Sequence, residues 1–186
     1  MERLGPIARS ASGRWACIVI LAGLAITAHG QEQQEINRLI RAGQLGAASE
    51  RVEAILAKNP KDAKARFLKG VILSEQGKQT DAIGIFQSLT EDYPELPEPY
   101  NNLAVIYAAR GDYDKARSAL EAALRAQPAY AVAQQNLGDV YVQLARQAYS
   151  QALQLEPGNV VIPPKLALLR QLTQPVALQG SKTAQP

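Results

Sequence analysis

Residues 99–128 read PYNNLAVIYAARGDYDKARSALEAALRAQP, and this stretch decides the fold. Apolar and small residues recur in it at the spacing of a helix face, first before and then after the pair Gly111-Asp112. Pro128 ends the second segment, because proline cannot continue a helix. The stretch predicts two amphipathic helices that approach each other closely through alanines. The positions on the two faces are Leu103, Ala104 and Tyr107, followed by Ala116, Leu120 and Ala123.

Most of the chain repeats this stretch at one constant interval, the distance from Pro94 to Pro128. The repeated punctuation consists of the prolines Pro60, Pro94 and Pro128 and the glycines Gly43, Gly77 and Gly111. Small residues recur as Ala48, Ala82 and Ala116 and as Gly70, Ala104 and Gly138. Larger apolar residues recur as Leu39, Leu73, Tyr107 and Tyr141 and as Val52, Phe86 and Leu120. The agreement of so many columns indicates an internal repeat of one helical unit.

This pattern resembles the tetratricopeptide repeat, a helix-turn-helix unit of about 34 residues with small, aromatic and proline residues at these offsets. The resemblance implies an all-α solenoid over residues 31–157, in units of about 31–60, 61–94, 95–128 and 129–157. Units two and three match well. The first helix of unit one, near Glu35 to Arg41, is polar, and we expect it to fray.

The fourth unit departs from the pattern, because its later columns arrive five residues early and the turn between its helices is missing. The residues Leu137, Tyr141, Leu144, Ala148, Ala152 and Leu155 form an unbroken helical stripe. We therefore predict one continuous helix over about 131–155. A hairpin with a very tight turn near 143–146 is the alternative.

The end of the chain predicts a cap for this long helix. The segment 158–174 contains Leu166, Leu168, Leu169 and Leu172 and is expected to form a C-terminal capping helix. A second copy of the chain would cover the same apolar stripe equally well. The tail 175–186 is short and polar, and we expect it to be disordered.

The segment 1–30 predicts a secretory signal peptide. Three arginines, Arg3, Arg9 and Arg14, precede an apolar run over residues 15–26, and small residues follow it before Gln31. The run is shorter than the roughly 20 residues of a membrane span, so an uncleaved inner-membrane anchor is the weaker alternative. We expect an exported, periplasmic protein that is not inserted in a membrane after cleavage.

The composition leaves little for catalysis. The single Cys, His, Trp and Met all lie within residues 1–30, so cleavage removes every imidazole and thiol. No phosphate loop, serine nucleophile elbow or calcium loop is present, and carboxylate pairs such as Glu91-Asp92 suit solvated helix ends. We expect no enzymatic activity, no cofactor and no metal site. The nearly neutral remainder gives no reason to expect a nucleic acid partner.

The resemblance implies a binding module whose concave surface, lined by the first helices of the hairpins, takes a segment of a partner protein. The adjacent Asn101 and Asn102 are the favoured contacts, because amides pair with a partner's backbone. Either side chain can instead face solvent or bond to the next hairpin. The full set of candidate contacts is Lys64, Phe67, Val71, Asn101, Asn102, Val105, Gln135 and Asp139.

Two functions follow from these expectations. The first is a cell-envelope adaptor that holds an unidentified envelope protein in its groove. The alternative is a self-assembling structural protein that dimerises through residues 131–172.

Overall fold

The computed structural model describes residues 30–172, and within that range every regular element is a helix. This confirms the all-α class expected from the sequence. The tail expected at 175–186 and all but the last residue of the signal peptide expected at 1–30 lie outside the described residues. A helix over residues 30–41 comes first. The helices that follow are α2 (Leu45–Lys58), α3 (Ala63–Glu75), α4 (Gln79–Asp92), α5 (Pro97–Ala109), α6 (Tyr113–Ala126), α7 (Ala131–Leu155) and α8 (Ile162–Leu172).

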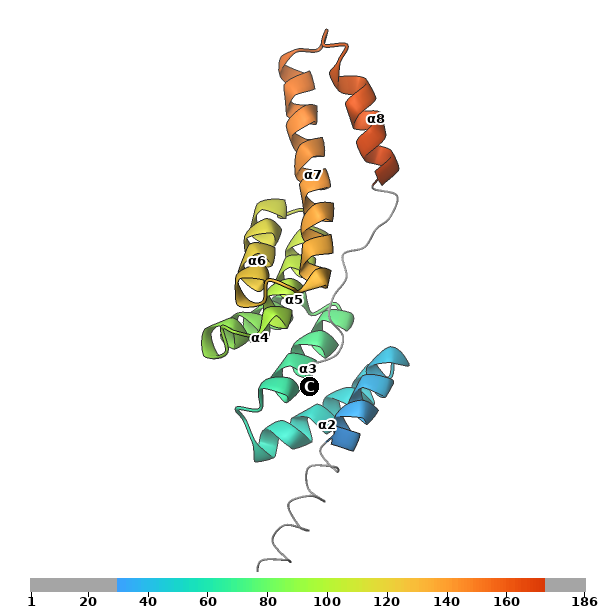
Figure 1. Ribbon diagram of the computed structural model, residues 1–186. Coiled ribbons are helices and arrows are strands. Elements are labelled where there is room, and N and C mark those ends of the chain that lie inside the picture. The colour runs from blue at the N-terminus through green and yellow to red at the C-terminus, as the bar shows by residue number, and fades with distance from the viewer. Residues whose placement is uncertain (1–29, 173–186) are drawn as a thin grey trace, which may run out of the picture.

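The helices pair into hairpins that stack along one direction (Figure 1). From α2 to α8 each helix packs on the next one along the chain, and the first helices of neighbouring hairpins also touch, α3 with α5 and α5 with α7. α7 extends beyond α5 and α6, and α8 folds back beside its far half (Figure 1). Across residues 30–172, no helix combines the length and the apolar content that a membrane crossing requires.

A glycine in the left-handed region closes the turn within each of the first three hairpins. Gly77 has a φ of +76°, where a Cβ atom would be strained. Its N–H donates to the Ser74 carbonyl at 3.0 Å, and the N–H of Lys78 donates to the Leu73 carbonyl at 2.9 Å. These two bonds satisfy carbonyls that the end of α3 would otherwise leave unpaired. Gly43 and Gly111 repeat the same arrangement.

The fourth unit has Ala145 at the position of these glycines, and the helix runs through it. α7 is a single helix of 25 residues, which confirms the expected long helix and excludes the tight hairpin. At 1.5 Å per residue it is about 37 Å long. α8 packs beside it and buries Ile162 and Leu166, so a capping helix does form within residues 158–174.

Small residues let the two helices of each hairpin approach closely. Ala48, Ala82 and Ala116, one in each second helix, are completely buried. Among the glycines of residues 30–172, only Gly70 has a close neighbour: a Cβ atom there would lie 2.6 Å from the ring of Phe86. Phe86 is itself completely buried. Its ring therefore occupies the space that a side chain at position 70 would need.

The helix over residues 30–41 corrects one expectation. It was expected to be polar and to fray, but one of its faces is apolar and buried. Ile36, Leu39 and Ile40 are each no more than 5% exposed and pack in the same core as α2. Three apolar residues at positions i, i+3 and i+4 form a complete stripe even where the rest of the helix is polar. On the outer side, Glu35 and Arg38 form an ion pair at 2.7 Å.

Gly70→Ala is expected to lower the free energy of unfolding by about 1–3 kcal/mol, because the new methyl group overlaps the Phe86 ring. Gly138→Ala is the matched control: it has the same repeat position, but nothing lies within 4 Å of a Cβ atom there. At this exposed helical site alanine should raise stability by roughly 0.5–1 kcal/mol. Denaturant unfolding followed by circular dichroism measures both. Equal effects would contradict the close approach at Gly70.

Candidate partner-binding site

The first helices of three successive hairpins, α3, α5 and α7, form one face of the stack. We call it the first-helix face. The repeat period places Val71, Val105 and Asp139 at the same point of these three helices. Because α3 touches α5 and α5 touches α7, the three residues form a row across this face.

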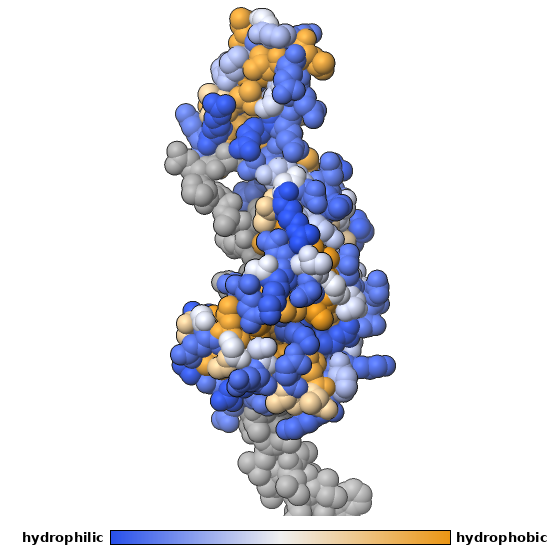
Figure 2. Space-filling view, turned by 180° about the vertical axis from the view of Figure 1, so that it is seen from behind, coloured by the Kyte–Doolittle hydropathy of each residue, from blue (hydrophilic) through white to orange (hydrophobic). Residues whose placement is uncertain are grey.

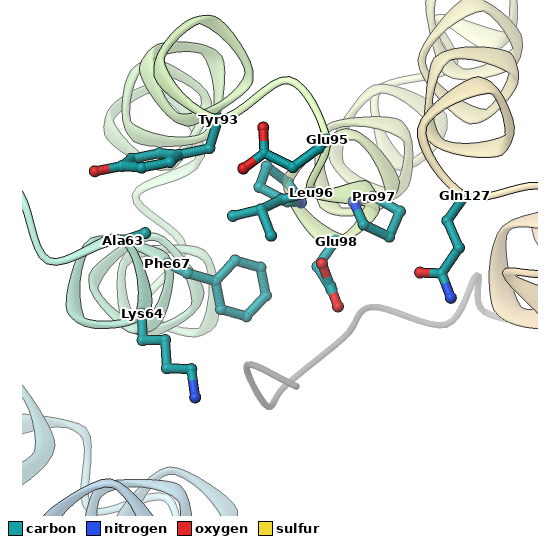
Figure 3. Close-up of a pocket in the computed structure, with 10 residues that line it drawn as sticks. Ala63, Lys64, Phe67, Tyr93, Glu95, Leu96, Pro97, Glu98 and Gln127 are labelled. Carbon is teal, nitrogen blue, oxygen red and sulfur yellow. The ribbon is translucent and has the colours of Figure 1, made fainter. Parts of the chain in front are cut away.

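A cavity of about 440 Å³ opens where α3 and α5 begin. Figure 3 shows Phe67 of α3 projecting into it, with Leu96 and Pro97 from the start of α5 opposite and Gln127 from the end of α6 to one side. Most of the lining is apolar. The lining residues are Ala63, Lys64, Phe67, Tyr93, Glu95, Leu96, Pro97, Glu98, Pro99 and Gln127.

Phe67 connects this cavity to the core. Its ring packs against that of Phe86 with centroids 5.7 Å apart, and only 4% of the residue is exposed. Phe86 in turn fits against Gly70. The floor of the cavity therefore packs against the ring that fills the space beside Gly70.

Three of the lining residues are charged, namely Lys64, Glu95 and Glu98. The Glu98 carboxylate points into the space between Phe67 and Gln127 (Figure 3). Only 7% of Glu98 is exposed, and none of the ion pairs found among residues 30–172 includes it. It lies in the first turn of α5, where the helix dipole favours a carboxylate. The cavity thus holds a carboxylate that forms no ion pair among residues 30–172.

Prolines allow the start of α5 to line a mostly apolar cavity. Leu96 has an extended backbone, with φ −83° and ψ 117°, as expected for a residue before proline. Pro97 and Pro99 follow in the first turn and carry no N–H group, so fewer donors need a partner there. The helix accordingly begins without a side-chain cap.

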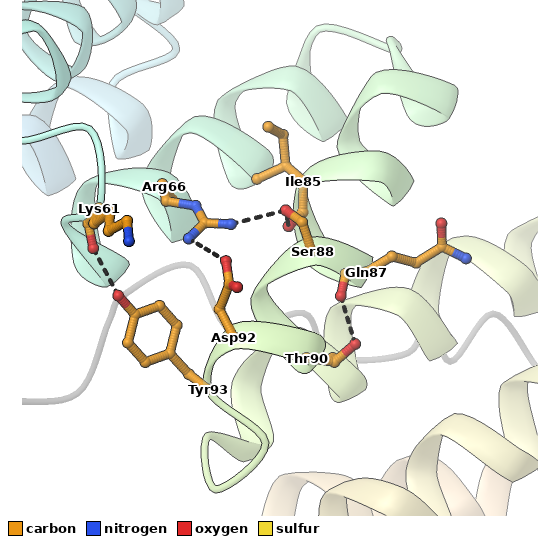
Figure 4. A network of polar contacts seen from close by, with 8 residues as sticks. All are labelled: Lys61, Arg66, Ile85, Gln87, Ser88, Thr90, Asp92 and Tyr93. Atoms are coloured by element: carbon orange, nitrogen blue, oxygen red, sulfur yellow. Dashed lines mark hydrogen bonds and ion pairs between the residues drawn. The ribbon is translucent and has the colours of Figure 1, made fainter.

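A polar network joins α3 to the end of α4 behind the cavity (Figure 4). The guanidinium of Arg66 pairs with the Asp92 carboxylate at 2.7 Å and donates to the Ser88 hydroxyl at 2.9 Å. The Tyr93 hydroxyl donates to the carbonyl of residue 61, in the turn before α3, at 2.8 Å. These contacts fix the two segments that supply Phe67 and Tyr93 to the cavity.

The structure brings only some of the expected contact residues together. Lys64 and Phe67 both line the cavity. Val71 is buried and Val105 is half-buried in the row across the first-helix face. Gln135 is exposed on α7, away from the cavity lining.

Asn101 and Asn102, the favoured contacts of the sequence analysis, each have a hydrogen-bond partner within the chain. Asn101 is completely buried, and its side-chain oxygen accepts a hydrogen bond from Nδ2 of Asn136 at 2.8 Å. Asn102 is 8% exposed and donates through Nδ2 to the Glu98 carbonyl at 2.9 Å. The first amide therefore joins α5 to α7, which is the alternative that the sequence left open, and the second bonds within α5.

Sequence reasoning missed Glu98 and the loop residues Tyr93, Leu96 and Pro97. A signal for Glu98 was present, because it stands one full repeat after Lys64 and so has the same repeat position. The other three lie in or beside the loop between hairpins, whereas the sequence pattern predicted contacts only on the faces of helices.

Unpaired acceptor oxygens mark the α7 end of the first-helix face. Oδ2 of Asp139 and Oε1 of Gln143, one turn later, are buried and have no hydrogen-bond partner. Burial raises the pKa of the Asp139 carboxyl above its ordinary value. On the helix over residues 30–41, Oδ1 of Asn37 is in the same condition. A hydrogen-bond donor would satisfy each of these atoms.

The arrangement is suited to recognition. Apolar cavities with a few placed polar groups are typical of binding sites. Within residues 30–172, no group of three or more His, Cys, Asp or Glu side chains is placed to hold a metal ion.

Comparison with protein families finds tetratricopeptide repeat models matching residues 34–97 and 97–130. The tetratricopeptide repeat domain-containing protein PYG7, a chloroplast protein of Arabidopsis thaliana, is 34% identical over 84 residues. That match covers 42% of this chain and 28% of the Arabidopsis protein, so the chain corresponds to a minor part of that relative.

Solved structures share the fold. MamA superposes with a TM-score of 0.52 at 21% identity, over 72% of this chain and 81% of MamA. A tetratricopeptide repeat protein from Parabacteroides merdae gives 0.54 at 21% identity, over 78% of this chain and 60% of that one. A chain of the Naa15/Naa10 complex bound to HypK-THB superposes with a TM-score of 0.56 at 22% identity. The superposition covers 77% of this chain and 22% of that one. At these identities the likeness concerns the fold alone.

Asn136→Ala is expected to lower the free energy of unfolding by about 1–3 kcal/mol, because it removes a donor to the buried Asn101 oxygen. Gln134→Ala, at an exposed position of the same helix, should change stability by no more than about 0.5 kcal/mol. Urea unfolding measures both values. A loss no greater than the control's would contradict a stabilising link between α5 and α7.

Asp139→Asn is expected to raise the free energy of unfolding at pH 7. The raised pKa means that the folded state disfavours the charged carboxylate, so ionisation costs stability above that pKa. The gain should disappear as the pH falls below the ordinary value of 3.8, where Asp139 is protonated in both states. Unfolding at a series of pH values tests this, with Asp81→Asn at an exposed site as control. A gain that persists at low pH would contradict it.

Proposed function

Because the chain belongs to the tetratricopeptide repeat family, we propose that it binds a segment of a partner protein on its first-helix face. The chain is a protein-protein interaction module. The proposal concerns the site on its surface and the chemistry of its partner. The observation that carries the proposal is the cavity between α3 and α5, with Phe67 as its floor and the unpaired Glu98 beside it. Such a cavity takes a projecting side chain.

A role as a scaffold, without catalysis, fits both the family and the cavity. Tetratricopeptide repeat proteins are in general scaffolds. The cavity lining combines apolar surface with two carboxylates and one ammonium group, which is the mixture used to orient a bound segment.

We place this function in the cell envelope, as an adaptor exported by its signal peptide. The basic start of the chain and the apolar run over residues 15–26 support this location. The mass of the intact protein from its own cells should correspond to a chain that begins near Gln31. Recovery of the full-length chain in the membrane fraction would overturn this placement.

Photo-crosslinking in cells tests the binding site. A crosslinking residue in place of Lys64, at the cavity, should capture a distinct protein that mass spectrometry identifies. The same residue in place of Asp81, exposed on the second helix α4, should not. Adding Leu96→Ala should reduce capture from position 64 severalfold, because Leu96 lines the cavity without belonging to the buried core. Equal capture from both positions would refute the site.

Self-association is the second candidate, and exposed apolar residues on the α7–α8 end favour it. Figure 2 shows hydrophobic residues gathered at that end of the molecule. Monomers seldom expose such a group of large apolar side chains unless it has a binding role. The side chains that are more than half exposed there are Leu155, Val160, Val161, Leu168 and Leu172.

Under this second candidate, the protein should be a dimer at micromolar concentration, and Leu168→Glu should convert it to a monomer. Gln171→Glu is the control, since it adds the same charge at an exposed polar position of α8. Analytical ultracentrifugation distinguishes the two states. A wild-type monomer at tens of micromolar would eliminate this candidate.

A further inference from the structure

We propose that the segment bound in the cavity between α3 and α5 carries a basic side chain beside an apolar one, and that its cationic group pairs with Glu98. The inference rests on the proposed function, because it names the chemistry of the partner at that same site.

The charge of the cavity favours a cation. The lining has carboxylates at Glu95 and Glu98 against one ammonium, that of Lys64. Glu98 is the decisive group, since only 7% of the residue is exposed and its carboxylate is directed into the cavity (Figure 3). In a mostly apolar cavity a carboxylate attracts a cation more strongly than it does in open water, because the interaction is less screened. An acidic segment would instead bring like charges together.

Lys64 does not neutralise Glu98. The two residues occupy the same repeat position on neighbouring first helices, yet no ion pair joins them. Figure 3 shows the Lys64 ammonium at the edge of the cavity, apart from the Glu98 carboxylate. The carboxylate of Glu98 is therefore open to a group that a partner inserts.

The rest of the lining calls for an apolar neighbour to that cation. Phe67, Leu96 and Pro97 present apolar surface within reach of Glu98 in the same cavity (Figure 3). The volume of about 440 Å³ falls within the range of roughly 300–1,000 Å³ that is usual for ligand sites. Two adjacent side chains of a peptide, one aliphatic or aromatic and one Lys or Arg, match this combination.

The α7 end of the first-helix face has the same preference. There the unpaired atoms are Oδ2 of Asp139 and Oε1 of Gln143, both acceptors. A segment that crosses from α3 to α7 would pass the half-buried Val105 and reach the part of α7 that holds these acceptors.

Selection from a phage-displayed library of random nonapeptides on the purified chain tests the proposal. The recovered peptides should be enriched in Lys or Arg adjacent to Leu, Ile, Phe or Met. Binding of a selected synthetic peptide should weaken about tenfold or more in Glu98→Gln, measured by fluorescence polarisation. It should stay unchanged in Asp81→Asn, which removes an exposed carboxylate from α4.

Charge reversal separates recognition from a structural role of Glu98. The variant Glu98→Lys should lose the basic peptide and gain the same peptide with its Lys or Arg changed to Glu. If Glu98→Gln does not fold, as thermal unfolding would show, the wild-type chain still decides the matter. Affinity for the basic peptide must then fall as salt rises from about 50 to about 500 mM, in the manner of a paired charge.

The outcomes distinguish this inference from the proposed function. Peptides that depend on Leu96 but are acidic or uncharged, or whose binding ignores both Glu98 and salt, would overturn the inference and leave the site standing. If no selected peptide depends on Leu96, the proposed site itself fails and the inference falls with it.

Discussion

The contact of Phe86 with the bare backbone of Gly70 holds the second hairpin together and sets the position of what lies around it. With no side chain at position 70, the Phe86 ring enters between α3 and α4 and is completely buried. Phe67, on the same helix as Gly70, also packs against that ring. A single close approach thus connects the packing of a hairpin to the floor of the candidate site. Tight interiors of this kind transmit small changes of volume, because there is little free space to absorb them.

The candidate site lies where one hairpin ends and the next begins. The helices contribute Phe67 and Glu98, and the loop between them contributes Leu96. Pro97 and Pro99, in the first turn of α5, remove donors that a mostly apolar cavity would leave unsatisfied. Behind it, Arg66 and Asp92 hold the flanking helices in register. The side of the site formed by α3 and the end of α4 is therefore held in place by these contacts before a segment binds, which lowers the entropic cost of binding.

How much of this follows from the sequence depends on the range of the interaction. The repeat period predicts the hairpins, and the missing glycine and turn predict α7, because these are local features. The hydrogen bond of Asn101 could not be predicted from its own helix, because its partner is Asn136, on a helix in the next hairpin. The helix over residues 30–41 was expected to be polar because it lacks the adjacent large and small residues of the other first helices, such as Leu103 and Ala104. Its buried face is formed by Ile36, Leu39 and Ile40 instead. The cavity needed the relative placement of two hairpins and a loop, which no single helix pattern contains.

The continuity of α7 gives the molecule a mechanical property. One end of this helix belongs to the first-helix face, through Asn136 and Asp139, and the other end carries α8 and the exposed Leu155. A helix bends sharply only where a glycine, a proline or a bulge interrupts it. The one glycine of α7 is Gly138, and neither glycine nor proline occurs from Asp139 to Leu155. The part of α7 from Asp139 to Leu155 therefore fixes the distance between the two surfaces. Two molecules bound at the two ends of α7 would be held at a fixed separation and orientation.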